Sequence, residues 1–169
     1  MPDNPKHSEQ VRQIIEAMES RDDATVCSLA KAHPELHSIK ANGGRTALHY
    51  AAVCGDKDLA KLLFVSGADV NARADNGATP LHAAAYNGHK GVAELLLAKR
   101  AKVNAKNTNS MTPLHVAAKA GKKDIIELLL ANGAEVDVKD KDDATPLDYA
   151  VYNGFKDVEE LLRAHGAKD

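Results

Sequence analysis

The sequence has few of the residues on which several classes of protein depend. It has no tryptophan, two phenylalanines and four tyrosines, so it offers little aromatic surface for stacking nucleic-acid bases. Its two cysteines, Cys27 and Cys54, form neither a CxxC pair nor a disulfide-rich pattern, which favours a reducing, cytoplasmic location. No apolar run approaches the roughly 20 residues of a membrane-spanning helix, and the polar start is no secretory signal.

The sequence also lacks a dominant charge and any familiar catalytic motif. With 22 basic and 24 acidic residues the net charge is −2, which gives no general attraction to polyanions. No nucleophile elbow, GxGxxG after a strand or phosphate-binding GxxxxGK[ST] occurs. The densest acidic group, in residues 140–148, suits a solvated face better than a divalent-ion site. We therefore expect a non-enzymatic protein without a cofactor.

What the sequence does contain is a short motif that recurs every 33 residues. A mid-unit glycine and a pair of leucines recur with the same spacing. Because several independent sequence positions share one period, the repeat is not a coincidence. The motif copies are Thr46-Ala47-Leu48-His49, Thr79-Pro80-Leu81-His82, Thr112-Pro113-Leu114-His115 and Thr145-Pro146-Leu147-Asp148; the glycines are Gly55, Gly88, Gly121 and Gly154.

The residues of each unit predict two short helices, and a loop connects the second helix to the next unit. In residues 74–106, Thr79 is suited to cap a helix, Pro80 to its first position and Gly88 to its end. A second apolar segment with helical spacing includes Leu95 and Leu96. Helices this short are marginal alone in water, so neighbouring units must bury their apolar faces.

The two ends of the repeat array differ from its middle. In the last copy, Glu159 and Arg163 stand where the earlier copies have apolar residues, as a terminal unit with a polar outer face requires. Residues 8–40 contain two apolar helical patterns, and Lys31 replaces an apolar residue there. We expect both ends to be caps and the stack to be complete.

These motifs resemble those of the ankyrin repeat family, strongly over residues 41–169 and weakly over residues 8–40. The resemblance implies an all-α, ankyrin-repeat solenoid that acts as a non-enzymatic, monomeric protein-binding module, either an adaptor or an inhibitor. The expected divisions are a flexible lead over 1–7, an N-terminal capping unit over 8–40, internal repeats over 41–73, 74–106 and 107–139, and a C-terminal capping repeat over 140–169.

In such stacks, partners usually bind a concave groove formed by the loop tips and the first helix of each unit. Tyr86, Tyr152 and Met111 stand out as predicted anchors of a protein or peptide, although either tyrosine could instead cover a neighbouring helix. Transferred by position, the candidates are Asn42, Arg45, Val53, Cys54, Asp75, Asn76, Ala78, Tyr86, Asn87, Thr108, Asn109, Met111, Lys119, Ala120, Lys141, Asp142, Ala144, Tyr152 and Asn153.

A basic track also follows the period: Lys40, Arg73, Lys106 and Lys139 each precede a loop tip. The five units carry net charges of −2, +1, +3, 0 and −4, so acidic ends flank a basic middle. This charge distribution favours an acidic or extended peptide along the groove edge. Alternatively, the basic residues only keep the loops soluble. A weak nucleic-acid or polyanion interaction with the basic unit is an alternative that the acidic ends disfavour.

Periodic histidines and asparagines raise two further alternatives. His49, His82 and His115 could suggest a metal site, but units stack about 10 Å apart, whereas zinc ligands lie about 2 Å from the metal. The resemblance implies a structural role, with each ring bonded near the threonine cap. It also suggests asparaginyl hydroxylation at Asn71 and Asn104, whose side chains could equally stabilise their loops by hydrogen bonds.

Three residues depart from the glycine pattern. Arg100 stands where Gly67, Gly133 and Gly166 close the second helix of other units, and Ser110 and Asp143 replace a turn glycine. If these residues keep the positive φ that glycine favours, each holds a strained backbone.

Overall fold

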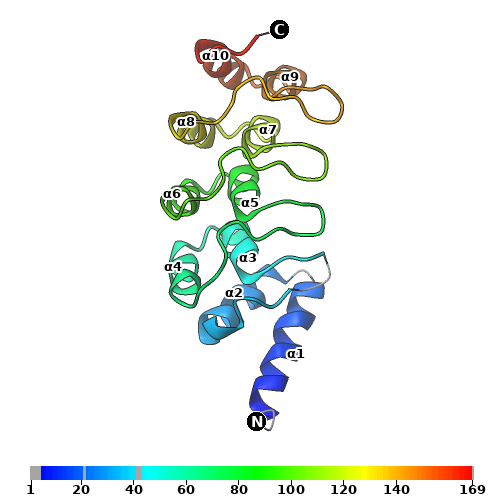
Figure 1. Ribbon diagram of the computed structural model, residues 1–169, viewed down its shortest axis with the longest axis vertical. Coiled ribbons are helices and arrows are strands. Elements are labelled where there is room, and N and C mark those ends of the chain that lie inside the picture. The colour runs from blue at the N-terminus through cyan, green and yellow to red at the C-terminus, as the bar shows by residue number, and fades with distance from the viewer. Residues whose placement is uncertain (1–4, 21, 41–42, 169) are drawn as a thin grey trace.

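The computed structural model describes residues 5–20, 22–40 and 43–168, and over these ranges it contains helices and no strand. The predicted all-α stack of helix pairs is confirmed (Figure 1). The helices are α1 (Pro5–Glu19), α2 (Asp23–Ala32), the 3-10 turn η1 (Pro34–Leu36), α3 (Ala47–Cys54), α4 (Lys57–Val65), α5 (Pro80–Asn87), α6 (Lys90–Ala98), α7 (Pro113–Lys119), α8 (Lys123–Ala131), α9 (Pro146–Tyr152) and α10 (Lys156–Ala164).

The repeated motif builds the first helix of each unit as the sequence predicts. Thr79 caps α5 with an extended backbone, and Pro80 occupies the first turn, where its missing N–H costs no hydrogen bond. Gly88 ends the helix at a φ of 79°, in the left-handed region where a side chain is disfavoured. Asn87 strengthens this end, because its side-chain amide donates to the carbonyl of Ala83 at 2.8 Å.

The loops between units stack on one another through backbone hydrogen bonds. Each loop tip donates one N–H to a carbonyl of the preceding loop, and the three bonds repeat with the sequence period. The donors Asp75, Thr108 and Lys141 bond Gly43, Asn76 and Asn109 at 2.9, 2.9 and 3.0 Å, respectively. At Gly44 a side chain would collide with Asp75, so the close approach of two loops requires glycine there.

The core runs the length of the stack between two columns of helices (Figure 1). The first helices α3, α5, α7 and α9 pack in one column. The second helices α4, α6, α8 and α10 pack in the other, which we call the outer column. The paired alanines of the first helices, such as Ala84 and Ala85, are fully buried. Small side chains allow the helix backbones to approach closely, which explains the high alanine content and the scarcity of aromatic residues.

The last helix carries polar side chains at two positions that are apolar in the earlier units, whereas the first helix pair contributes buried apolar residues. Arg163 and Glu159 form an ion pair at 3.1 Å on the last helix, at positions where α4, α6 and α8 carry apolar residues. At the other end, Ile14 and Met18 of α1 and Val26 of α2 are buried in the first helix pair.

The first helix is longer than the sequence indicates. Helix α1 begins at Pro5 and extends past the end of the stack (Figure 1). Residues 5–7 are therefore helical, whereas they were predicted to belong to a flexible lead; residues 1–4 of that lead lie outside the described residues. Within the described ranges, no helix combines the length and the apolar character needed to cross a membrane.

Candidate functional site

A cavity of about 220 Å³ lies where the first helices meet the loops in the middle of the stack. Apolar walls from α3, α5 and α7 meet polar groups from the loops, a combination that ligand-binding pockets commonly present. The lining residues are Arg45, His49, Val53, Ala74, Asn76, Ala78, Thr79, His82, Ala83, Tyr86, Asn87, Asn107 and Val116. Six of the predicted groove residues, Arg45, Val53, Asn76, Ala78, Tyr86 and Asn87, are thus brought together.

A second hollow of about 390 Å³ adjoins this cavity on its N-terminal side. It shares Arg45 and Asn76 with the first and adds Asp75, together with Glu19 and Tyr50. The two hollows adjoin at Arg45 and Asn76, and we call them together the groove. It carries a cation and carboxylates at one end and apolar walls at the other.

Two tyrosines on the first helices expose large amphipathic surfaces. Tyr86 on α5 lines the cavity and is 55% exposed, while Tyr152 on α9 is 88% exposed. Tyr86 directly follows the buried Ala84 and Ala85, and Tyr152 follows the exposed Val151, so neither ring lies in the core. Neither tyrosine is buried by a neighbouring helix.

Other predicted groove residues have different roles or positions. Met111 is only 8% exposed, so its side chain is not free to anchor a partner as the sequence suggested. Lys119 lies over the ring of Tyr149, with its Nζ 5.4 Å from the ring centre. The side-chain amide of Asn153 donates to Tyr149 of its own helix at 2.8 Å. Thr108, Asn109, Lys141 and Asp142 are exposed at the loop tips, Ala120 and Ala144 are half-buried, and Asn42 lies outside the described residues.

The residues of the basic track do not line the cavity beside Tyr86. Lys40 and Arg73 line a separate hollow with Asn71 and Gly67. The guanidinium of Arg73 donates to the carbonyl of Lys106 at 2.9 Å, so this arginine also ties one loop to the next. Lys106 and Lys139 are exposed at the equivalent positions of the next two units.

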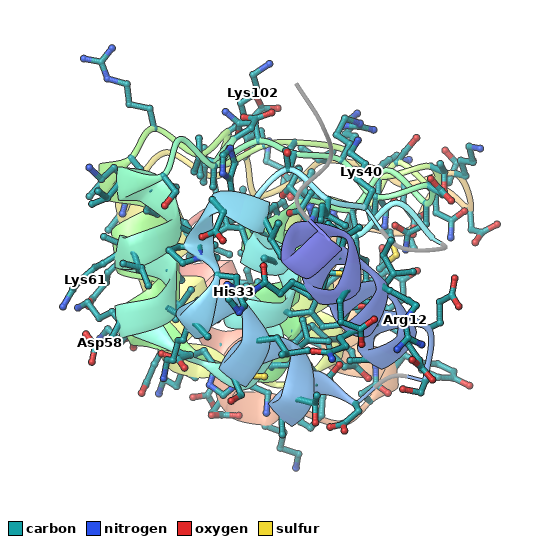
Figure 2. The ribbon with its side chains drawn as sticks, turned by 90° about the horizontal axis from the view of Figure 1, so that it is seen from below. Arg12, His33, Lys40, Asp58, Lys61 and Lys102 are labelled. Atoms are coloured by element: carbon teal, nitrogen blue, oxygen red, sulfur yellow. The ribbon has the colours of Figure 1, made fainter. Side chains whose placement is uncertain are left out.

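Figure 2 looks along the stack from its N-terminal end and separates the charged side chains by face. Lys40 and Lys102 lie along the edge that the loops form, whereas Asp58 and Lys61 project from the outer helix column, where they form an ion pair at 3.0 Å (Figure 2). The positive edge and the outer column are thus distinct surfaces.

The three periodic histidines join successive units. In each ring Nδ1 accepts the backbone N–H of the threonine three residues earlier at 3.1 Å, so Nδ1 carries no proton. The ring is therefore the neutral tautomer protonated at Nε2, and Nε2 donates to a carbonyl of the following loop. His49, His82 and His115 bond Ala78, Met111 and Ala144 in this way at 3.1, 3.0 and 3.2 Å.

This geometry lowers the histidine pKa values. Burial disfavours a charged ring, and it lowers the pKa of His49 and of His82 to about 4, although the carbonyl partner opposes the shift. Burial lowers the pKa of His115 as well. Over the described residues, no group of three or more histidine, cysteine or carboxylate side chains is placed to hold a metal.

Asp148 shows why the last copy departs from histidine. Its carboxylate accepts both the N–H and the hydroxyl of Thr145 at 2.7 Å, so it caps α9 as histidine caps the other first helices. It reaches no following loop, and as an acceptor it could not donate to one.

The periodic asparagines also bridge units. Oδ1 of Asn71 accepts the N–H of Lys102 at 2.9 Å, and Oδ1 of Asn104 accepts that of Glu135 at 3.0 Å. Asp137, in the next copy, accepts the N–H of Lys168 at 3.1 Å. These side chains make the loop hydrogen bonds that were the alternative to a modification site.

Comparison with known protein families gives a match to ankyrin repeats (3 copies) over residues 14–107 and 99–169, which together span most of the chain. The chain belongs to the ankyrin repeat family. A search of curated proteins found no significant match. Ankyrin repeats are generally protein–protein interaction modules, and the family is typically non-enzymatic.

The ankyrin repeats also contribute cavity residues that were not among the predicted groove residues. Ala83 and Val116 line the cavity from the same position of successive repeats, where Tyr50 and Tyr149 stand in the flanking copies. The variation of this position between repeats was a usable signal. Asn107 directly precedes the candidate Thr108, and its position also varies between repeats, as Ala41, Ala74, Asn107 and Asp140.

Proposed function

We propose that this ankyrin repeat protein binds an extended protein or peptide segment in the groove formed by the first helices and loops of its central repeats, as a non-enzymatic adaptor or inhibitor. The observation that supports the proposal is the cavity beside Tyr86, where apolar side chains remain open to solvent beside amide and guanidinium groups. Aromatic and arginine side chains of this kind provide most of the binding energy in many interfaces.

The chemistry of the groove suggests what the partner carries. An apolar side chain would enter between Val53, Ala83 and Val116, and its backbone would meet the amides of Asn76 and Asn107. Binding there buries apolar surface that folding leaves exposed, which is favourable.

The charge distribution supports an acidic partner. The 74–106 unit has a net charge of +3 from side chains outside the cavity lining, and Arg45 lines the cavity itself; Glu19 and Asp75 in the adjoining hollow oppose this charge. Acidic residues that flank the apolar side chain would raise the association rate, and high salt would lower it. We also propose a cytoplasmic, monomeric protein, in keeping with its two free thiols.

A peptide library selected on the immobilised full chain tests the proposal. We expect the selected peptides to bind the Tyr86→Ala variant about 10–100-fold more weakly, since a tyrosine that becomes buried in an interface contributes strongly to binding. Isothermal titration calorimetry would measure the change in Kd.

The matched control is Val65→Ala, which removes an 87% exposed apolar side chain from α4 in the outer column. It should bind the peptides as the native protein does. Selected peptides that bind the Tyr86→Ala variant with unchanged Kd would show that the partner surface lies elsewhere.

A further inference from the structure

The two cysteines, 27 residues apart in the sequence, lie side by side in the fold. The Sγ atoms of Cys27 and Cys54 are 2.9 Å apart, and both are free thiols. A disulfide has an S–S distance of about 2.05 Å, so the two sulfur atoms need to approach by only about 0.9 Å to bond.

The packing of two helices places the thiols together. Cys27 lies on α2, and Cys54 is the last residue of α3; these helices pack against each other at the junction of the N-terminal unit and the first repeat. The equivalent position to Cys27 in the next two units is a fully buried alanine, Ala60 or Ala93, and Asn87 stands at the position of Cys54 in the second repeat. Only this junction therefore brings two sulfur atoms together among the described units.

We propose that Cys27 and Cys54 are a modification site at which a hydroperoxide forms a reversible intramolecular disulfide. The Cys54 thiol releases its proton and the thiolate attacks the peroxide; the O–O bond breaks, a sulfenic acid forms, and the leaving hydroxide takes up the released proton to give a molecule of water. The sulfur of Cys27 then attacks the sulfenic sulfur; the S–S bond forms, the S–O bond breaks, and the second water leaves with the Cys27 proton. Two thiols and one hydrogen peroxide thus yield one disulfide and two waters.

The different environments of the two thiols set the order of these steps. Cys54 is exposed at the end of α3, where a small oxidant reaches it. Cys27 is only 7% exposed, and its burial raises the pKa of the thiol, so it reacts poorly with anything in solvent. Its one accessible electrophile is the sulfur directly beside it, which makes it suited to resolve the sulfenic acid.

The disulfide would fasten the N-terminal unit to the first repeat. Such a bond restricts the unfolded chain between the two cysteines, and so it stabilises the folded junction. Val53, which precedes Cys54, lines the groove cavity, and its carbonyl accepts the Nε2 proton of His89 at 2.8 Å. The oxidised site would therefore hold the end of α3 that borders the groove.

Mass spectrometry of the reduced full chain, after treatment with hydrogen peroxide, tests the proposal. We expect a monomer lighter by about two daltons, a Cys27–Cys54 linkage in the proteolytic map and full reversal by dithiothreitol. The oxidised protein should also show a Tm higher by about 5–10 °C, and slower hydrogen exchange in α2 and α3.

Two variants control the order of the steps. Cys54→Ser should show no mass change, because Cys27 is shielded from the oxidant. Cys27→Ala, a substitution to the residue found at this position in other repeats, should retain a sulfenic acid at Cys54, seen as a gain of about 16 Da.

Either of two results in the native chain would overturn the proposal. One is a disulfide-linked dimer through Cys54, and the other is overoxidation of Cys54 while Cys27 remains a free thiol. Neither result bears on peptide binding in the groove, which is tested separately.

Discussion

At the scale of single residues, three side chains occupy backbone positions that favour glycine. Arg100, Ser110 and Asp143 have φ values of 66°, 60° and 59°. The glycines equivalent to Arg100 have φ between 84° and 96°, so the repeat geometry holds a positive φ there even when the residue has a side chain. The turn persists because backbone hydrogen bonds of 2.9 Å, from Arg100 to Leu97 and from Ala101 to Leu96, hold it in place.

Replacing this strained arginine should stabilise the protein. Because a left-handed conformation costs a non-glycine residue about 1 kcal/mol, we expect Arg100→Gly to raise the free energy of unfolding by about 0.5–1 kcal/mol. Urea denaturation followed by circular dichroism would measure the change.

The neighbouring Lys99 provides the control for the arginine substitution. Its φ is −88°, which suits a residue with a side chain, so Lys99→Gly should lower stability instead. Equal effects of the two substitutions would show that backbone strain at Arg100 is not released.

At the scale of elements, neutral histidines connect the first helix of one unit to the loop of the next. The same ring caps its own helix through Nδ1 and bonds the following loop through Nε2. Protonation of Nδ1 would replace an acceptor with a donor that faces a backbone N–H, so it breaks the cap and places a charge in the core.

Stability should therefore fall as the pH decreases from about 6.5 to 4. In the unfolded chain these histidines bind a proton near pH 6.5, whereas the folded pKa of His49 and His82 is about 4. The unfolded state thus takes up more protons in this window, and each ring removes on the order of 2–3 kcal/mol of stability across it. Above pH 6.5 the neutral histidines contribute their full stabilisation to the folded state.

Nuclear magnetic resonance of the ring protons provides the direct measurement. His49 and His82 should titrate with midpoints near pH 4 in the folded protein, while urea midpoints decrease between pH 6.5 and 4.5, above the range of ordinary carboxyl groups. Folded-state midpoints near 6.5 would contradict the proposed tautomer and its role.

At the scale of the whole molecule, the described residues form a linear stack in which each unit packs mainly against its neighbours along the columns (Figure 1). Stability in such arrays is the sum of unit and interface contributions, so a defect has a different effect at the centre and at an end. Leu96 of α6 and Leu162 of α10 are equivalent residues, two repeats apart, and both are fully buried.

These two leucines allow a matched comparison of position in the stack. Each substitution to alanine should cost about 2–5 kcal/mol locally. Leu96→Ala weakens a unit with neighbours on both sides, and we expect it to lower the main unfolding transition. Leu162→Ala should instead open residues 140–168 before the rest of the stack unfolds.

Hydrogen exchange followed by mass spectrometry distinguishes the two leucine variants. The Leu162→Ala chain should lose protection in α9 and α10 alone, with α5 and α6 protected as in the native protein. Loss of protection along the entire stack in both variants would show that the molecule unfolds as a single cooperative unit.

The sequence alone determined the architecture, because its signals act over a few residues. A threonine cap, a proline in the first turn and a closing glycine specify a short helix wherever they occur, as in α5. A 33-residue period then places identical units side by side. Six of the residues that line the cavity beside Tyr86 could be selected by position for the same reason, whereas Ala83, Val116 and Asn107 were missed.

Only the tertiary structure decided the contacts that depend on how one unit is rotated against the next. It buried Met111, placed Lys40 and Arg73 outside the cavity of Tyr86, and brought Cys27 to within 2.9 Å of Cys54. No local rule predicts such distances, because they result from the packing of whole helices, and the cysteines belong to different units. The sequence thus specified the unit, and the packing between units determined which side chains meet.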